Sequence, residues 1–218
     1  MTYRSPLYHY RSGCRLCNSA ALTKVFALTP TPPANAFVSK EQLSTKQPTY
    51  PLELFFCENC SHLQLLGVVD PSELFRNYVY VSGTSASFIK HFSDYANTCI
   101  DDFNLSAGDL VIDIGSNDGT LLQFFQDKQL NVLGIDPARN ISKQASKKGI
   151  ETWPKFFNET VANKILETKG QVSLITANNM FAHADDLAGI VKSIRSLLTP
   201  SGVFIFEVSY LSAVFEDT

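Results

Sequence analysis

Four of the five cysteines stand in two C-x-x-C pairs, and this arrangement constrains the fold more than any other feature. The pairs are Cys14 with Cys17 and Cys57 with Cys60. Each short turn places two sulfur atoms on one side, so two turns can complete a tetrahedron of thiolates around a zinc ion. Because all four ligands come from the protein, such a site is closed and structural. The pattern therefore predicts a zinc-binding N-terminal domain.

Disulfides and a redox-active C-x-x-C are the alternatives to a metal site. The start of the chain, MTYRSPLYHY, is polar and does not read as a secretory signal. We therefore expect a cytoplasmic protein, in which paired cysteines are more often metal ligands than disulfides. Cys99 stands apart, on the apolar face of a predicted helix, and we expect it to be a buried structural thiol.

Length and charge limit the domain count and the partners. The chain has 218 residues, enough for one domain of ordinary size and a smaller one. We predict a zinc-binding domain over residues 1–82, which the family resemblance described below implies to be a substrate domain, and a second domain over residues 83–218. The formal net charge is -3, so we expect no nucleic-acid partner. No apolar run approaches the roughly 20 residues of a membrane helix, so we expect no membrane partner either.

The two parts differ in their predicted elements. Prolines at positions 30, 32 and 33 exclude a regular helix or a central strand there, so an extended arm is expected. Strands are predicted on either side of the second cysteine pair, from TYPLELFFCENC and over residues 62–69. Later strands are predicted at 110–114, 132–136, 150–152, 173–177 and 203–208, and helices at 88–103, 119–127, 139–148, 158–167 and 186–198. Apolar strands alternating with helices indicate a doubly wound parallel α/β sheet.

The stretch DIGSNDG lies between the first strand of this sheet and its helix. The dinucleotide fingerprint G-x-G-x-x-G is absent, because the glycines fall only at Gly115 and Gly119. Asp113 at the strand end repels a phosphate and suits a ligand that carries an ammonium group. Asp136 ends the next strand and suits the diol of a ribose. These features favour S-adenosylmethionine over NAD.

Asn117 occupies a position in this turn where many such loops carry a further glycine. Asparagine enters the left-handed backbone region at little cost. We therefore expect Asn117 to hold the turn and to offer its side-chain amide to the ligand.

The chain resembles the N-terminal half of the deoxysugar C-methyltransferases, a tripartite family that methylates nucleotide-linked keto-deoxysugars. The matching stretches cover nearly the whole chain: CRLC, PPANAF, YPLEL, CENC, LQL, YVYVSGTS, DIGSNDGTLL, GIDP and ANNMFAHADDL. The resemblance implies a Rossmann-like class I methyltransferase domain, incomplete at its C-terminal end and preceded by a small zinc-binding domain. It also implies S-adenosyl-L-methionine and Zn²⁺ as cofactors and a nucleotide-linked sugar as substrate.

The resemblance also implies site residues. Around the cofactor it marks Asp113, Gly115, Ser116, Asn117, Gly119, Asp136, Pro137, Asn178 and Asn179. On the sugar side it marks Tyr78 and His183 as catalytic candidates. Methylation of carbon requires removal of a proton beside a ketone, for which a histidine is a suitable base near neutral pH. The family's usual catalytic histidine, however, lies in a Glu-His segment beyond the strand that reads FEVSYL here.

No such segment follows within the 218 residues. The five predicted strands of the second domain also do not include the antiparallel pair that usually ends a methyltransferase domain. We therefore expect a truncated chain that binds cofactor without turning over a keto-sugar. A missing C-terminal domain or a partner chain would complete the site.

Several alternatives remain open at this point. The chain could be an RNA or protein methyltransferase whose zinc unit holds the substrate, or a non-catalytic fragment that binds zinc and cofactor and needs a partner. The segment around Tyr78 and Tyr80 fits either a linker or a cover for the site.

Overall fold

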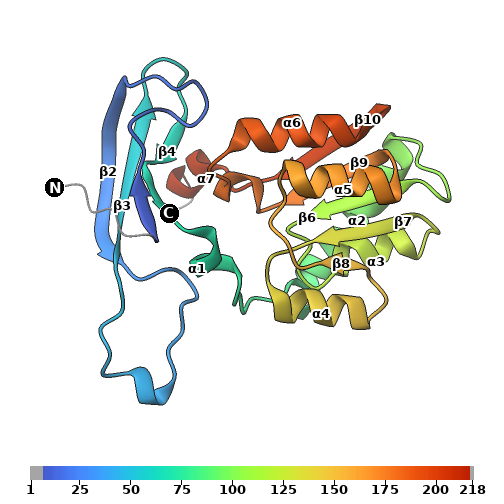
Figure 1. Cartoon of the computed structure of the whole chain (residues 1–218), viewed down its shortest axis with the longest axis horizontal. Coiled ribbons are helices and arrows are strands. Elements are labelled where there is room, and N and C mark those ends of the chain that lie inside the picture. Colours follow the sequence, from blue (N-terminus) through green and yellow to red (C-terminus); the bar gives the residue numbers. More distant parts are fainter. Residues whose placement is uncertain (1–6, 217–218) are drawn as a thin grey trace. The chain divides into compact units, whose positions relative to one another are not determined.

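The computed structural model describes residues 7–216. The chain divides into two compact units, with the division between Tyr80 and Val81. Figure 1 labels the helices and strands of both units. Among the described residues, no helix combines the length and the apolar character that crossing a membrane requires.

The first unit is built mainly from antiparallel strands. A three-stranded sheet has the order β2-β3-β4, and a two-stranded sheet pairs β1 with β5. The bounds are Tyr8–Tyr10 for β1, Leu22–Thr31 for β2, Tyr50–Cys57 for β3, Leu63–Leu65 for β4 and Gly67–Val69 for β5. A 3₁₀ turn, η1, covers Lys40–Gln42, and a short helix, α1, covers Pro71–Phe75.

The prolines of the arm lie where the sheet tolerates them. β2 is an edge strand of its sheet, and its pairing with β3 shifts register between Leu28 and Thr31. Pro30 falls inside this shift, where a missing backbone N–H removes no regular ladder bond. The prediction that this segment forms no central strand is therefore confirmed. The edge strand β2 nevertheless extends further into the arm than predicted.

The single strand predicted over residues 62–69 is wrong. The segment forms two strands, β4 and β5, which belong to different sheets. Between them the backbone carbonyl of Leu66 accepts a hydrogen bond from the N–H of Arg11, 2.9 Å away. This contact with the start of the chain, together with burial of the Leu66 side chain, redirects the backbone from one sheet to the other.

The second unit contains one five-stranded parallel sheet of order β10-β9-β6-β7-β8. Its strands are β6 (Leu110–Ile114), β7 (Asn131–Ile135), β8 (Thr152–Trp153), β9 (Val172–Asn178) and β10 (Leu198–Glu207). Its helices are α2 (Ala86–Asp102), α3 (Thr120–Gln126), α4 (Arg139–Lys147), α5 (Glu159–Lys169), α6 (Leu187–Leu197) and α7 (Leu211–Glu216), with 3₁₀ turns η2 (Ser82–Thr84) and η3 (Phe181–His183). The predicted doubly wound α/β fold is confirmed.

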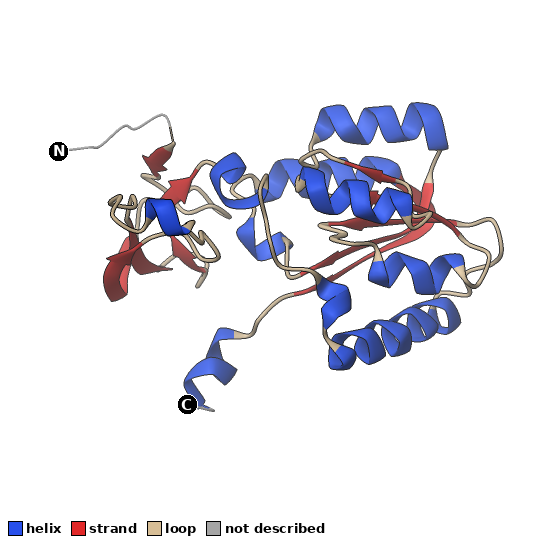
Figure 2. Cartoon of the chain, turned by 90° about the horizontal axis from the view of Figure 1, so that it is seen from below, coloured by secondary structure: helices blue, strands red, loops and turns tan. Residues whose placement is uncertain are grey.

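Helices cover both faces of this sheet (Figure 2). One core cluster joins the sheet to α5 and α6, and the other joins it to α2, α3 and α4. Along β6, Ile112 belongs to the first cluster and Val111 to the second, as the alternation of side chains in a strand requires. All five residues of β6 are buried, which explains its uninterrupted apolar sequence.

The strand order fixes where a ligand can bind. β6 lies between β7 and β9, so the chain leaves β6 toward one edge and later returns to its other side. In open parallel sheets, ligands bind beyond the carboxyl ends of the strands at such a switch point. The loops that follow β6, β7 and β9 are therefore the candidate site.

Candidate zinc centre and cofactor site

The four paired cysteines converge in the first unit. Their sulfur atoms all lie within 4.8 Å of one another. Cys14 and Cys60 are 3.6 Å apart at sulfur, as are Cys17 and Cys57. A tetrahedral ion with Zn–S bonds of about 2.3 Å requires sulfur separations of about 3.8 Å. The cluster therefore fits a zinc ion.

Both cysteine turns have the same backbone form. A non-glycine residue with a positive φ follows each pair: Asn18 at 59° and Ser61 at 61°. In each turn, the N–H of this residue donates to the carbonyl of the first cysteine, at 2.9 Å for Cys14 and 2.8 Å for Cys57. The tight turns place both sulfur atoms of a pair on one side.

Gln64 supports the cluster from β4. Its side-chain Nε2 donates to Cys14 Sγ at 3.1 Å, while its Oε1 accepts from the Arg15 backbone N–H at 2.9 Å. Burial opposes ionisation of Cys14, but the N–H groups of Cys17 and Leu16 and the Gln64 amide outweigh it and lower the pKa of that thiol to about 6. No spacing in the sequence marks Gln64, because its role depends on how β4 packs beside the first pair.

The loop after β6 requires its two glycines. Gly115 has a φ of 83°, and a Cβ atom there would lie 2.9 Å from Met180 Cβ. Gly119 has a φ of 78°, and its Cβ would lie 3.0 Å from Ile150 Cγ2. Left-handed geometry and close packing together exclude a larger side chain at either position.

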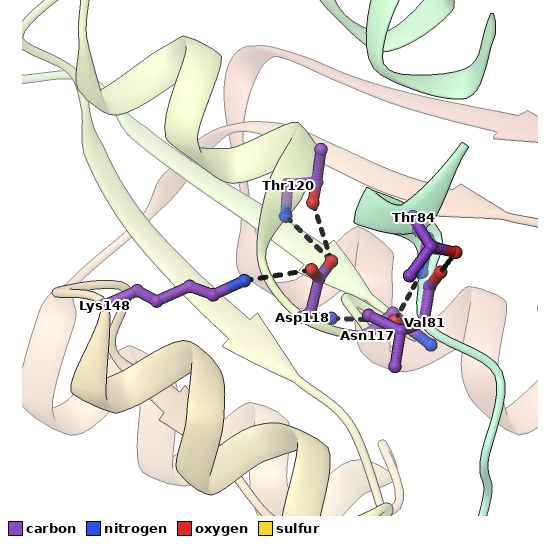
Figure 3. A network of polar contacts seen from close by, with 7 residues as sticks. Val81, Thr84, Asn117, Asp118, Thr120 and Lys148 are labelled. Carbon is purple, nitrogen blue, oxygen red and sulfur yellow. Dashed lines mark hydrogen bonds and ion pairs between the residues drawn. The ribbon is translucent and has the colours of Figure 1, made fainter. Parts of the chain in front are cut away.

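Asn117 adopts the predicted left-handed conformation, with a φ of 50°. Its Oδ1 accepts hydrogen bonds from the backbone N–H groups of Ser82 at 3.0 Å and Asp118 at 2.9 Å. Figure 3 shows Asn117 beside η2. The amide oxygen is therefore used inside the protein, where it joins the loop to η2, just before α2.

Asp136 holds the loop from the end of β7. Its Oδ2 accepts from the Asn117 N–H at 2.9 Å, and its Oδ1 accepts from the Ala138 N–H at 2.8 Å. Burial raises the pKa of Asp136, and these two N–H groups partly offset that effect. Pro137, between Asp136 and Ala138, is half-buried. Each carboxylate oxygen retains a further lone pair for a ligand hydroxyl.

Asp113 lies deeper, at the end of β6, with 4% of its surface exposed. Thr176 Oγ1 donates to Asp113 Oδ1 at 2.7 Å. Burial raises the pKa of Asp113 to about 7; the Thr176 hydroxyl acts against this rise and the nearby Asp136 charge adds to it.

Asp118, which the sequence analysis did not single out, belongs to the loop after β6, and its side chain is buried. Its Oδ1 accepts from Thr120 Oγ1 at 2.7 Å, and its Oδ2 pairs with Lys148 Nζ at 3.1 Å (Figure 3). The Asp118 side chain is 2% exposed and that of Lys148 is 58% exposed. The pair joins the loop to the C-terminal end of α4.

Several buried polar atoms around this loop lack a hydrogen-bond partner within the described part of the chain. They are Ser116 Oγ, both amide atoms of Asn178, and the hydroxyl of Tyr95. Buried polar groups are normally satisfied, so orphaned ones require an explanation such as a missing ligand. Ser116 and Asn178 were predicted as cofactor contacts, whereas Tyr95 was missed because it reads as part of the apolar face of α2. With Asp136, these groups fit an adenosyl cofactor.

The remaining predicted residues are Asn179, His183 and Tyr78. Asn179 donates from its backbone N–H to the Glu207 carbonyl at 2.6 Å, which joins the ends of β9 and β10. His183 ends η3 after β9, and burial lowers the pKa of its imidazole. Tyr78 belongs to the first unit, where its ring packs edge-on against Phe75 at 6.0 Å. Catalytic roles for Tyr78 and His183 stay predictions.

A separate concavity of about 530 Å³ lies at the opposite, amino-terminal edge of the sheet. Its lining residues include Asp109, Glu151 and Lys169. Lys169 is paired with Glu151 at 2.7 Å, and Asp109 accepts from Ser173 Oγ at 2.9 Å. These polar groups satisfy one another, and this edge is not where parallel sheets bind ligands. We therefore place the site at the loops after β6, β7 and β9.

A family model described as "Methyltransferase domain" matches residues 88–217, more than half of the chain. The chain belongs to this methyltransferase-domain family. A second family model, described as "Putative zinc binding domain", matches residues 14–75 and includes all four clustered cysteines.

Among curated proteins, the methyltransferase domain and its zinc unit together resemble the C-methyltransferase NovU of Streptomyces niveus. The two are 33% identical over 204 residues, which cover 94% of this chain and 49% of NovU. The ubiquinone biosynthesis O-methyltransferase of Ralstonia nicotianae is 28% identical over 109 residues, covering 49% of this chain and 46% of that protein. The chain thus spans about half the length of these relatives.

Among solved structures, the PH0226 protein of Pyrococcus horikoshii OT3 superimposes with a TM-score of 0.51 at 16% identity, covering 63% of this chain and 62% of that one. The plantazolicin methyltransferase BpumL reaches a TM-score of 0.50 at 11% identity, covering 62% and 52%. These likenesses concern the fold alone. The fold of the methyltransferase domain is the class I fold of S-adenosylmethionine-dependent methyltransferases.

Proposed function

We propose that this chain binds S-adenosylmethionine at the loop after β6 and belongs to a C-methyltransferase that acts on a nucleotide-linked keto-deoxysugar. The observation that carries the proposal is the loop itself, which Asp136 anchors through the Asn117 N–H, together with the buried, unsatisfied side chains of Ser116 and Asn178. The similarity to NovU supports methylation of carbon. The motifs that this chain shares with the deoxysugar family support a sugar as the substrate.

In this proposal, some residues of the site bind the cofactor and another removes a proton from the substrate. When bound, S-adenosylmethionine supplies an electrophilic methyl group. Asp136 would hold the ribose hydroxyls, while Ser116 and Asn178 would satisfy their orphaned atoms on the cofactor. Near neutral pH, His183 carries a neutral imidazole, because burial lowers its pKa. It can therefore accept the proton from the carbon beside the ketone.

The zinc ion has a different part in this proposal. Four thiolates fill its coordination sphere and leave no position for a substrate or water. We infer that zinc stabilises the first unit.

Calorimetry with S-adenosylhomocysteine tests the cofactor assignment. We expect binding by the unmodified chain, and weakening by about 1.5–3 kcal/mol in Asp136→Ala, because a charged hydrogen-bond acceptor is lost. Asp127→Ala, which removes an exposed acid at the end of α3, is the control and should bind normally. Preferential binding of NAD would contradict the proposed class of cofactor.

A methyl-transfer assay with labelled cofactor tests the substrate class. We expect any transferred label to reach a nucleotide-linked 4-keto-deoxysugar and to form a carbon–methyl bond, identified by mass spectrometry and NMR. Label found in RNA or in a protein instead would support the alternative methyltransferase functions.

A further inference from the structure

Tyr95 combines a well-packed ring with an unsatisfied hydroxyl. The ring packs against the core cluster formed by α2, α3 and the sheet. The hydroxyl oxygen is buried and makes no hydrogen bond to any described residue. A buried hydroxyl without a partner destabilises the folded chain. Phenylalanine would fill the same space without that cost, so packing alone does not account for a tyrosine here.

The surroundings of the hydroxyl lie at the carboxyl edge of the sheet. The Asn178 side chain at the end of β9 faces the Tyr95 hydroxyl closely enough to lower its pKa as a hydrogen-bonding neighbour, although the geometry between the two groups is not that of a formed hydrogen bond. Asp113 at the end of β6 and Glu207 at the end of β10 also act on it. Polar groups at the ends of three strands therefore influence this one buried phenol.

The orientation of Tyr95 is firmly set. Phe92, Ala96 and Cys99 bury the same face of α2 in the core. One turn before Tyr95, the His91 ring lies 2.7 Å from Glu207 Oε2, which ties the helix to the end of β10. The hydroxyl therefore has little freedom to turn toward water.

The charges around the hydroxyl indicate the kind of ligand. Burial raises the pKa of Tyr95, and the nearby Cys99, Asp113 and Glu207 groups raise it further. The phenol thus stays protonated and neutral, while two acidic side chains stand close by. Such an environment favours a ligand group that carries positive charge.

The strand order then indicates which end of the cofactor reaches this point. Asp136 ends β7 on one side of β6, whereas Asn178 and Glu207 end β9 and β10 on the other side. If the ribose lies on Asp136, one end of the cofactor extends toward β9. The adenine end is neutral, whereas the methionine end carries an ammonium, a carboxylate and a sulfonium group and is positive overall. The acidic surroundings select the methionine end.

We propose that the Tyr95 hydroxyl and the Asn178 amide bind the methionine end of the S-adenosyl cofactor, which makes Tyr95 a further cofactor-binding residue. This inference rests on the proposed function, because it requires the same cofactor in the same loop.

The test measures two ligands by calorimetry with the unmodified chain and with Tyr95→Phe. S-adenosylhomocysteine carries the amino-acid group, and methylthioadenosine lacks it. We expect Tyr95→Phe to weaken S-adenosylhomocysteine about tenfold, the effect of one hydrogen bond, and to leave methylthioadenosine within about twofold. Tyr50→Phe, in the first unit, is the matched control and should change neither affinity.

A thermal melt without ligand separates binding from a structural role. Because the hydroxyl has no partner in the free protein, Tyr95→Phe should melt at the same temperature or higher. A lower melting temperature together with equal losses for both ligands would assign the hydroxyl to the fold and overturn the inference. Unchanged affinity for S-adenosylhomocysteine in the variant would overturn it as well. Failure of the unmodified chain to bind S-adenosylhomocysteine would overturn the proposed function itself, and the inference with it.

Discussion

At the scale of single residues, the buried acids at the carboxyl edge of the sheet destabilise the free protein but favour ligand binding. Asp113 and Asp136 are both buried, and burial raises the pKa of each. Neither carboxyl has a cationic partner among its recorded hydrogen bonds in the described chain. Their charge therefore costs free energy in the free protein, and a cationic ligand would recover part of it.

Asp113 should make the free protein less stable as the pH rises. An unfolded aspartate titrates near pH ~3.9, and in the folded chain burial raises the pKa of Asp113 to about 7. Between these values the folded state binds a proton that the unfolded state has lost, so stability falls with rising pH. The penalty is complete above pH ~7 and amounts to at most about 4 kcal/mol.

Asp113→Asn keeps an acceptor for Thr176 and removes the charge. Chemical denaturation from pH 5 to pH 8 should show a flatter stability profile for this variant than for the unmodified chain. Identical profiles would mean that Asp113 is ionised in the fold at little cost.

Gln64 should control how tightly the zinc is held. Its amide donates to Cys14 Sγ, and loss of such an outer hydrogen bond commonly weakens metal binding 10- to 100-fold. We expect Gln64→Leu to release zinc at least about tenfold more readily in a competition with a chromogenic chelator. Gln171→Leu, at an exposed position in the second unit, is the control; equal release by both variants would show that the Gln64 contact has no effect on the metal.

At the scale of elements, the ion pair between Asp118 and Lys148 joins α4 to the loop after β6. Lys148→Met should destabilise the second unit by about 1–3 kcal/mol, because it leaves a buried carboxylate with only its Thr120 contacts. Lys147→Met removes the neighbouring, exposed charge of the same helix. Urea denaturation should separate the two variants, and equal losses would point to an effect of α4 charge rather than of the pair.

At the scale of the whole molecule, the two compact units should differ in their dependence on zinc. Neither hydrophobic core cluster includes a described residue of the first unit, which holds the four-cysteine cluster, whereas both core clusters lie on the parallel sheet of the second unit. Structural zinc sites contribute free energy of folding directly. Calorimetric scans should therefore show one transition that chelator removes and another that it leaves nearly unchanged.

Cys57→Ser should reproduce the effect of chelator, because it removes one ligand. Cys99→Ser lies outside the cluster and should keep the zinc. Elemental analysis of the unmodified chain should find one zinc per chain, and its absence from protein purified without chelator would contradict the metal assignment.

The sequence by itself determined the features that depend on local chemistry. Paired cysteines predicted the metal cluster, alternating apolar strands and helices predicted the parallel sheet, and Asn117 predicted a left-handed turn. Each rests on residue types at short spacings, where backbone geometry leaves few options. The cap of α2 is also local, since the Ser85 hydroxyl, a preferred N-cap group, accepts from the Phe88 N–H.

The tertiary structure decided what depends on contacts between distant segments. It separated residues 62–69 into strands of two different sheets, because the start of the chain pairs with β5. It placed Gln64 against Cys14, Lys148 against Asp118, and Tyr95 among the ends of three strands. No local pattern records these neighbours, because they arise only when the packed helices and sheets bring side chains together.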